Sequence, residues 1–254
     1  MRRVTTLGAA LVLLAAAGCA AVCLRLGWLP CRGQMLIGTP WGHDGEYTDA
    51  CLRAMNRGPA IYFPPVPAEQ SDTELAAAAG AFALAGLAWI VVALGLPLSR
   101  TARAVVASAA SPTVLMAVLT AVGWLNGVDV GRVSLVPGLL SEVALLVGAV
   151  VACCAVSRTR DRLALLALSW GCGAFGAGHL LGEYLVLGSI NQDNWDWPPG
   201  SGVLMVASLV IGVLGALLGV TGSRRPRPGR QRTERTSRSA ASRIIRVSPG
   251  QSRS

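Results

Sequence analysis

Six long apolar stretches separated by polar connections dominate the pattern of this chain. They are Val4 to Leu24, Leu75 to Leu98, Ala104 to Leu125, Ser134 to Val156, Leu163 to Leu187 and Val203 to Val220. A helix that crosses a bilayer needs about 20 mostly apolar residues, because the hydrocarbon core is about 30 Å thick and each residue rises about 1.5 Å. None of the six has the polar face of a helix in a soluble bundle. The pattern predicts an all-α integral membrane protein, a bundle of six transmembrane helices spanning 1–24 and 75–222.

The arginines in the connections predict the orientation of these spans. If the N-terminus is inside the cell, the inner connections hold seven arginines and the segment after the last span adds ten. The outer connections hold five, namely Arg25, Arg32, Arg53, Arg57 and Arg132. Cytoplasmic loops keep the excess of positive charge in membrane proteins. We therefore expect N-in/C-in topology, with both termini on the cytoplasmic side.

The first span, residues 1–24, has two interpretations. Two arginines, an apolar run and Ala16-Ala17-Gly18-Cys19 are similar to a bacterial lipoprotein signal, which is cleaved before its cysteine. However, the apolar run continues to Leu24, which is the full length of a span, and Ala stands at position 16 where such signals usually have Leu. We favour an uncleaved helix, and cleavage at Cys19 remains the alternative.

The largest polar segment, residues 25–74, is predicted to be an extracytoplasmic loop. It is too short to form a core of its own without a covalent staple. Its two cysteines, Cys31 and Cys51, would lie in an oxidising compartment, so we predict a disulfide between them. Residues 48–56 read as a short helix, with Thr48 or Asp49 as the N-cap and Gly58 beyond its end.

Three ionisable residues deep within the spans form the candidate site. Such residues are costly in a bilayer and are functional candidates for that reason. His179 and Glu183 are one turn apart on one face of the fifth span, and Glu142 lies about two turns from the outer end of the fourth. Both offsets correspond to a similar depth, so Glu142, His179 and Glu183 are candidates for a proton or cation site that is open to the outside, although we prefer a purely structural role for them.

Small residues on the fifth span bear on the packing around this candidate site. Gly171, Ala174, Gly178 and Gly182 form a stripe that allows a neighbouring helix, which could be the fourth, to approach closely. The alternative to a functional cluster is a hydrogen-bonded pair that only fixes helix packing, or a Glu183 side chain that reaches to the membrane interface.

Familiar site chemistries find little support in the sequence. The segment Gly178 to Gly182 resembles the His-bearing helix of rhomboid proteases over five residues, but no Gly-x-Ser-Gly nucleophile precedes it. The spacing of His43, Asp44, Glu46 and Asp49 matches no metal motif, so no metal site is predicted. Residues 191–199 are acidic and aromatic, which favours a solvated interface over weak binding of an ion or glycan. The sequence assigns no cofactor.

Charge is concentrated in the last segment, residues 223–254. Its ten arginines against Glu234 give +9, which equals the net charge of the whole chain. The segment is too polar to bury a core, so we expect it to be disordered and drawn to anionic lipid heads. Because the remainder is neutral and 53% of the chain is hydrophobic, we do not expect nucleic acid as a partner.

The composition also bears on where the protein resides. Arginine supplies all 22 basic side chains and lysine none, a bias typical of a high-GC bacterial genome such as that of an actinomycete. Together with the spans, this predicts a multi-pass protein of a bacterial plasma membrane.

Three classes of function are compatible with these features. A non-catalytic accessory or scaffold that contacts a membrane protein partner is preferred, because no inverted repeat is evident and no span is broken by paired Gly and Pro. The first alternative is a small proton- or cation-coupled transporter that uses Glu142, His179 and Glu183. The second is a metal-dependent membrane enzyme.

Overall fold

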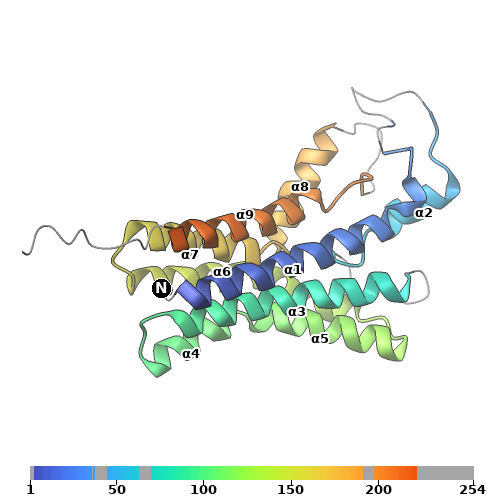
Figure 1. The fold of residues 1–254 in the computed structure, drawn as a ribbon. Helices are drawn as coiled ribbons and strands as arrows, with labels where there is room; N and C mark the ends of the chain where they lie inside the picture. Colours follow the sequence, from blue (N-terminus) through green and yellow to red (C-terminus); the bar gives the residue numbers. More distant parts are fainter. Residues whose placement is uncertain (1–2, 36, 38–44, 63–69, 191–196, 222–254) are drawn as a thin grey trace, which may run out of the picture. The chain divides into compact units, whose positions relative to one another are not determined.

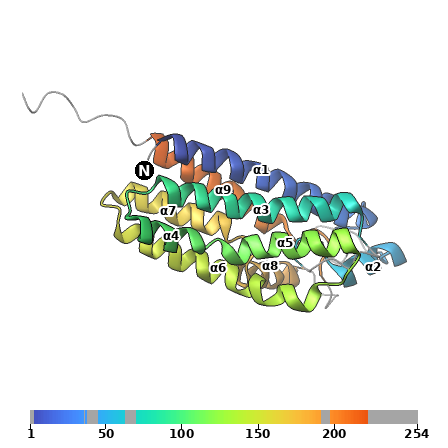
Figure 2. The same cartoon turned by 90° about the horizontal axis from the view of Figure 1, so that it is seen from below.

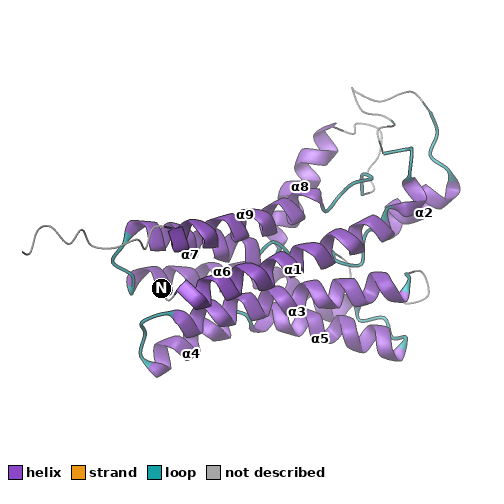
Figure 3. Cartoon of the chain, in the orientation of Figure 1, coloured by secondary structure: helices purple, strands orange, loops and turns teal. Residues whose placement is uncertain are grey.

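Helices form every regular element of the structure, a computed structural model that describes residues 3–35, 37, 45–62, 70–190 and 197–221 (Figure 1). No strand occurs in these ranges (Figure 3), and the prediction of an all-α protein is confirmed. The elements are, in chain order, α1 (Arg3–Gly27), η1 (Leu29–Cys31), α2 (Asp49–Arg57), α3 (Asp72–Gly95), α4 (Arg100–Ser108), α5 (Ser111–Asn126), α6 (Gly131–Cys154), α7 (Thr159–Cys172), α8 (Ala177–Ile190) and α9 (Val203–Thr221).

Four of the described helices are long and apolar enough to cross a membrane. They are α1, α3, the part of α6 from Val136 to Cys154, and α9. Two further candidates are bent pairs, α4 with α5 at 46° and α7 with α8 at 74°. The described residues therefore contain four candidate spans, or six if each bent pair counts as one.

The bends have identifiable causes in the sequence. Pro112 is near the start of α5, where its missing N–H removes one bond that would continue α4 into α5. Between α7 and α8 the chain reads Gly173-Ala-Phe-Gly176, and glycine is the weakest helix former after proline. The sequence has no span broken by paired Gly and Pro, yet the fifth predicted span is interrupted between Cys172 and Ala177, at a segment that contains two glycines and no proline.

Helix α1 packs against both α3 and α9 (Figure 2). Helix α3 also packs on α5, and α7 packs on α9. Large side chains such as Leu13, Phe82, Trp89 and Leu209 are fully buried at these contacts. The small-residue stripe contacts two neighbouring helices: Gly171 packs against α9, and Gly178 packs against Glu142 of α6. A Cβ at Gly171 would lie 2.8 Å from the Cα of Gly212, so these helices need glycine to approach this closely.

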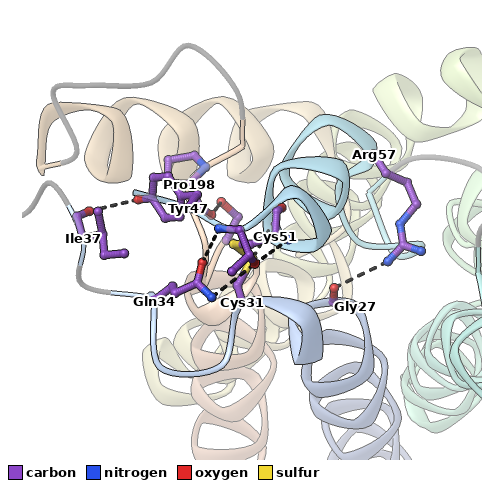
Figure 4. Close-up of a disulfide and its surroundings, with 10 residues drawn as sticks. Gly27, Cys31, Gln34, Ile37, Tyr47, Cys51, Arg57 and Pro198 are labelled. Atoms are coloured by element: carbon purple, nitrogen blue, oxygen red, sulfur yellow. Dashed lines mark hydrogen bonds between the residues drawn. A yellow bond between two sulfur atoms is a disulfide. The ribbon is translucent and has the colours of Figure 1, made fainter. Parts of the chain in front are cut away.

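The first polar loop is tied together in the way the sequence predicts (Figure 4). Cys31 and Cys51 form a disulfide, and α2 begins after Thr48, whose hydroxyl accepts a hydrogen bond from the N–H of Cys51 at 3.4 Å. Gly58 ends the helix with φ of 68°, a conformation that favours glycine. The side-chain oxygen of Gln34 accepts the N–H of Thr48 at 2.8 Å and joins the two halves of the loop.

Several predictions concern residues outside the described ranges. They include the Arg-rich segment 223–254 with its expected lipid contacts, the possible ligands His43 and Asp44, and residues 191–196. Residues 1–222 form one compact unit by their internal contacts, and all described helices belong to it.

Candidate functional site

Glu142 lies near the middle of α6 and reaches the start of α8. Its Oε2 atom accepts hydrogen bonds from the backbone N–H groups of Gly178 at 2.7 Å and of His179 at 3.3 Å. The first N–H groups of a helix have no partner within that helix, and the helix dipole favours negative charge there. The carboxylate of one helix therefore caps the first turn of another.

Glycines shape the space around this carboxylate. A Cβ at Gly178 would lie 2.6 Å from Oε2 of Glu142, and one at Gly176 would overlap the Cβ of Glu142 itself. A Cβ at Gly173 would be 3.5 Å from the Cα of Glu142. The residues that interrupt the α7–α8 span thus also let the backbone approach α6 closely, since glycine has no side chain to interfere.

His179, which is buried, forms a pair with the half-buried Glu142. Its Nδ1 atom is 3.2 Å from Oε1 of Glu142, within ion-pair distance, and its side chain is only 5% exposed against 25% for Glu142. The ring of Trp170 lies against the imidazole with centroids 4.2 Å apart. The distance to Glu142 is short, but the geometry at both ring nitrogens falls outside that of a hydrogen bond with any described residue. Nε2 is therefore a buried polar atom without a described partner.

Glu183 does not join this pair. Its Oε1 atom accepts the backbone N–H groups of Gly202 at 2.6 Å and of Leu204 at 3.1 Å, so it caps the start of α9. Its Oε2 atom accepts a hydrogen bond from the hydroxyl of Tyr62. The structure brings Glu142 and His179 together, whereas Glu183, which is 1% exposed, binds a different helix end.

Tyr62 is the partner that the sequence did not reveal. Its ring stacks on Trp197 with centroids 5.5 Å apart, and its hydroxyl meets Glu183. Burial, and then the charge and hydrogen bond of Glu183, raise the pKa of Tyr62 far above its usual range. Tyr62 therefore keeps its proton and remains a donor. Tyr62 and Glu183 are 121 positions apart, so no local pattern could have paired them.

The chemistry available to the Glu142–His179 pair is proton exchange. A carboxylate and an imidazole can each bind a proton, and the charge of the pair changes when they do. Among the described residues there is no group of three or more potential metal ligands. The described free cysteines Cys23 and Cys172 are buried, which favours a packing role.

Comparison with known proteins assigns no family to this chain. Searches against protein-family models, curated protein sequences and solved structures each found no match.

Proposed function

We propose that this protein is a small proton-coupled membrane transporter in which Glu142 and His179 bind and release the proton. It would have six transmembrane helices, counting each bent pair as one, with both termini on the cytoplasmic side of a bacterial plasma membrane. The observation that carries the proposal is the 74° break between α7 and α8 together with the ionisable pair of Glu142 and His179 that lies at the start of α8.

Broken spans are a recurring feature of transporter sites. A discontinuous helix exposes backbone N–H and C=O groups inside the membrane, where they bind substrates or coupling ions. Here the N–H groups at the start of α8 are directed at the carboxylate of Glu142. Because the sequence preference for an accessory role depended partly on unbroken spans, the break shifts the balance towards transport.

Protonation would alter the contacts that hold the break together. An ionised Glu142 makes charge-assisted hydrogen bonds with the first turn of α8, and these weaken when the carboxylate is neutral. His179 can take up a proton through Nε2, which has no described partner, and its imidazolium would then face Glu142 and the ring of Trp170. A proton on the pair would therefore weaken the attachment of the start of α8 to α6, and coupling requires such a difference between the protonated and deprotonated states.

The arrangement of the arginines supports the proposed orientation. Arg160 at the start of α7 donates to the hydroxyl of Thr221 at the end of α9, 3.1 Å away. Arg103 of α4 donates to the carbonyl of Leu98 at 3.0 Å. The start of α1, α4 and the α6–α7 connection lie at one end of the helical unit, and α2 lies at the other (Figure 1). The positive-inside rule would assign the arginine-rich end to the cytoplasm.

An accessory role is the second candidate, and a specific observation favours it. Each oxygen of Glu142 already has a protein partner in the cap of α8 or in His179. In that case the carboxylate fixes helix packing only, and the disulfide-linked loop would be the surface that a membrane partner contacts.

Proton flux into proteoliposomes separates the two candidates. Purified protein is reconstituted with a pH-sensitive dye inside, and a proton gradient is applied to the wild type, Glu142→Gln and His179→Gln. Glu46→Gln is the matched control, because Glu46 is exposed in the loop and far in sequence from the break. Thermal unfolding in detergent reports whether each variant folds.

Transport predicts flux in the wild type and in Glu46→Gln, and its loss in both site variants while they remain folded. Glu142→Gln retains an oxygen acceptor for the α8 cap, so a purely structural role predicts little change in the thermal stability of this variant. A folded wild type without flux above empty liposomes would exclude proton movement unaided by a co-substrate, and would favour the accessory role. If proton flux also stays at the level of empty liposomes when a panel of small solutes is added on one side, the proposed transport function is rejected.

A further inference from the structure

A groove at the C-terminal end of α1 lies apart from the Glu142–His179 pair. Its volume is about 410 Å³, and the lining residues that matter here are Leu24, Arg25, Trp28, Arg32, Met35 and Val203. It lies at the end of α1 and the start of α9. These two helix ends are in close contact, since a Cβ at Gly202 would overlap the side chain of Leu24. The groove therefore lies at the level where two candidate spans end.

Two arginines give the groove its charge. Arg25 is in the last turn of α1, and Arg32 directly follows the short helix η1. Across the described part of the chain, neither guanidinium has a hydrogen bond or an ion pair. Each guanidinium has five N–H donors in a planar fork that suits phosphate oxygens. A favourable contact with the dipole of α1 could explain Arg25 alone, but not a second arginine on the same groove.

The floor of the groove is rigid and apolar. Trp28 is only 5% exposed, and its indole N–H donates to the carbonyl of Ser201 at 2.7 Å, which ties α1 to the segment before α9. The disulfide at Cys31 holds the adjoining loop to α2. The hydrogen bond and the disulfide therefore fix two parts of the groove's lining and its surroundings, and binding sites are usually largely pre-formed in this way.

The rim of the groove carries exposed apolar side chains. Val203 is 62% exposed and Met35 is 41% exposed. An apolar surface beside two arginines that have no partner among the described residues is unsuited to a small hydrophilic anion. It suits an amphiphile with an anionic head and a hydrocarbon chain.

We propose that this groove binds an anionic phospholipid of the adjacent leaflet. The phosphate is held between Arg25 and Arg32, and an acyl chain runs along Leu24 and Val203. In the proposed topology this is the outer leaflet. The inference does not depend on Glu142 or on transport, so it stands or fails separately from the proposed function.

Binding of fluorescent phosphatidylglycerol to the detergent-purified full chain tests the site, with phosphatidylcholine as the neutral lipid. The variants are Arg25→Gln with Arg32→Gln, and Arg53→Gln as the matched control. Arg53 is also in the first loop but lines a different cavity. Each arginine near a lipid surface contributes about fivefold in affinity. We expect the wild type and Arg53→Gln to prefer phosphatidylglycerol, and the double variant to lose that preference.

Other results overturn the proposal. They are equal binding of both lipids by the wild type, an equal loss of preference in Arg53→Gln, or retained preference in the folded double variant. Inorganic phosphate serves as the competitor: displacement of the lipid at equal concentration would indicate a site for free phosphate. If the double variant unfolds, Arg32→Gln alone, at an exposed position, is expected to lower the preference about fivefold.

Discussion

Oε2 of Glu142 accepts the backbone N–H of Gly178 at 2.7 Å, so a carboxylate from the middle of α6 caps the first turn of α8. Glu183 does the same for α9 through the N–H of Gly202. A buried acid is tolerated only when hydrogen bonds replace its hydration. In this protein the two acids deep in the candidate spans obtain those bonds from the unpaired N–H groups of a neighbouring helix.

Glu142→Ala should destabilise the protein more than Glu142→Gln does. Alanine leaves the N–H groups of Gly178 and His179 without an acceptor, at a cost of about 2–4 kcal/mol. Glutamine keeps an oxygen at the same reach, so the loss should be smaller by at least about 1 kcal/mol. Thermal unfolding in detergent measures both, and equal losses would contradict the capping role.

Gly176→Ala should disturb the break, whereas Gly182→Ala should not. A Cβ at Gly176 would overlap the Cβ of Glu142, but one at Gly182 meets nothing within 4 Å. We expect a loss of about 1–3 kcal/mol from overpacking in the first variant. In the second, the better helix propensity of alanine should give no loss or a gain of about 0.5–1 kcal/mol. The unfolding midpoints of the two variants provide the comparison.

Tyr62→Phe should weaken the attachment of the first loop to the helices. It removes the hydroxyl that Glu183 accepts, and a buried acceptor that loses its partner costs about 1–3 kcal/mol. A double-mutant cycle with Glu183→Gln should show a coupling above about 0.5 kcal/mol, as expected for residues in contact. Additive effects of the two changes would argue against the contact.

The raised pKa of Tyr62 also predicts a dependence on pH. The unfolded chain releases this proton near pH 10, while the folded chain retains it. The folded chain therefore binds the proton more tightly than the unfolded chain does. The stabilisation is complete below about pH 10 and decreases as the pH rises above that value. Between pH 8 and about 11, the free energy of unfolding should decrease more steeply with pH for the wild type than for Tyr62→Phe.

Removal of the disulfide should loosen the first loop. Cys31 and Cys51 are 20 positions apart, and a closed loop of that length stabilises by about 3 kcal/mol in the chain-entropy model. The double change to serine should therefore lower the unfolding midpoint, and reductant should lower it in the wild type only. Cys154→Ser is the control, because Cys154 is a free, exposed cysteine. An unchanged midpoint in the serine variant would show that the bond does not support the loop.

Helix α1 should be retained in the mature protein. Its buried face, which includes Ala9, Leu13 and Ala16, packs against α3 and α9, and cleavage before Cys19 would remove that face. Intact-mass measurement of the protein purified from membranes should give a mass that includes residues 1–18. A mass that begins at a lipidated Cys19 would instead identify a lipoprotein.

The apolar helices, the short helix α2 and its ends were readable from sequence because each depends on local chemistry. Length and hydropathy set the helices, Thr48 and Gly58 provide the caps of α2, and only two cysteines lie in the first loop. The candidate residues were found for a similar reason, since an ionisable side chain within an apolar stretch stands out without any knowledge of its neighbours.

The pairing of those residues was decided by tertiary structure. The shared helix face of His179 and Glu183 suggested one cluster, but Glu183 binds the start of α9 and Tyr62 instead. The break after Cys172 turns α8 by 74° from α7 and presents its first N–H groups to Glu142. Sequence alone determines which side chains need partners in an apolar environment. Which partners they obtain depends on where unpaired helix ends meet in space, and that follows from packing between segments far apart in the chain.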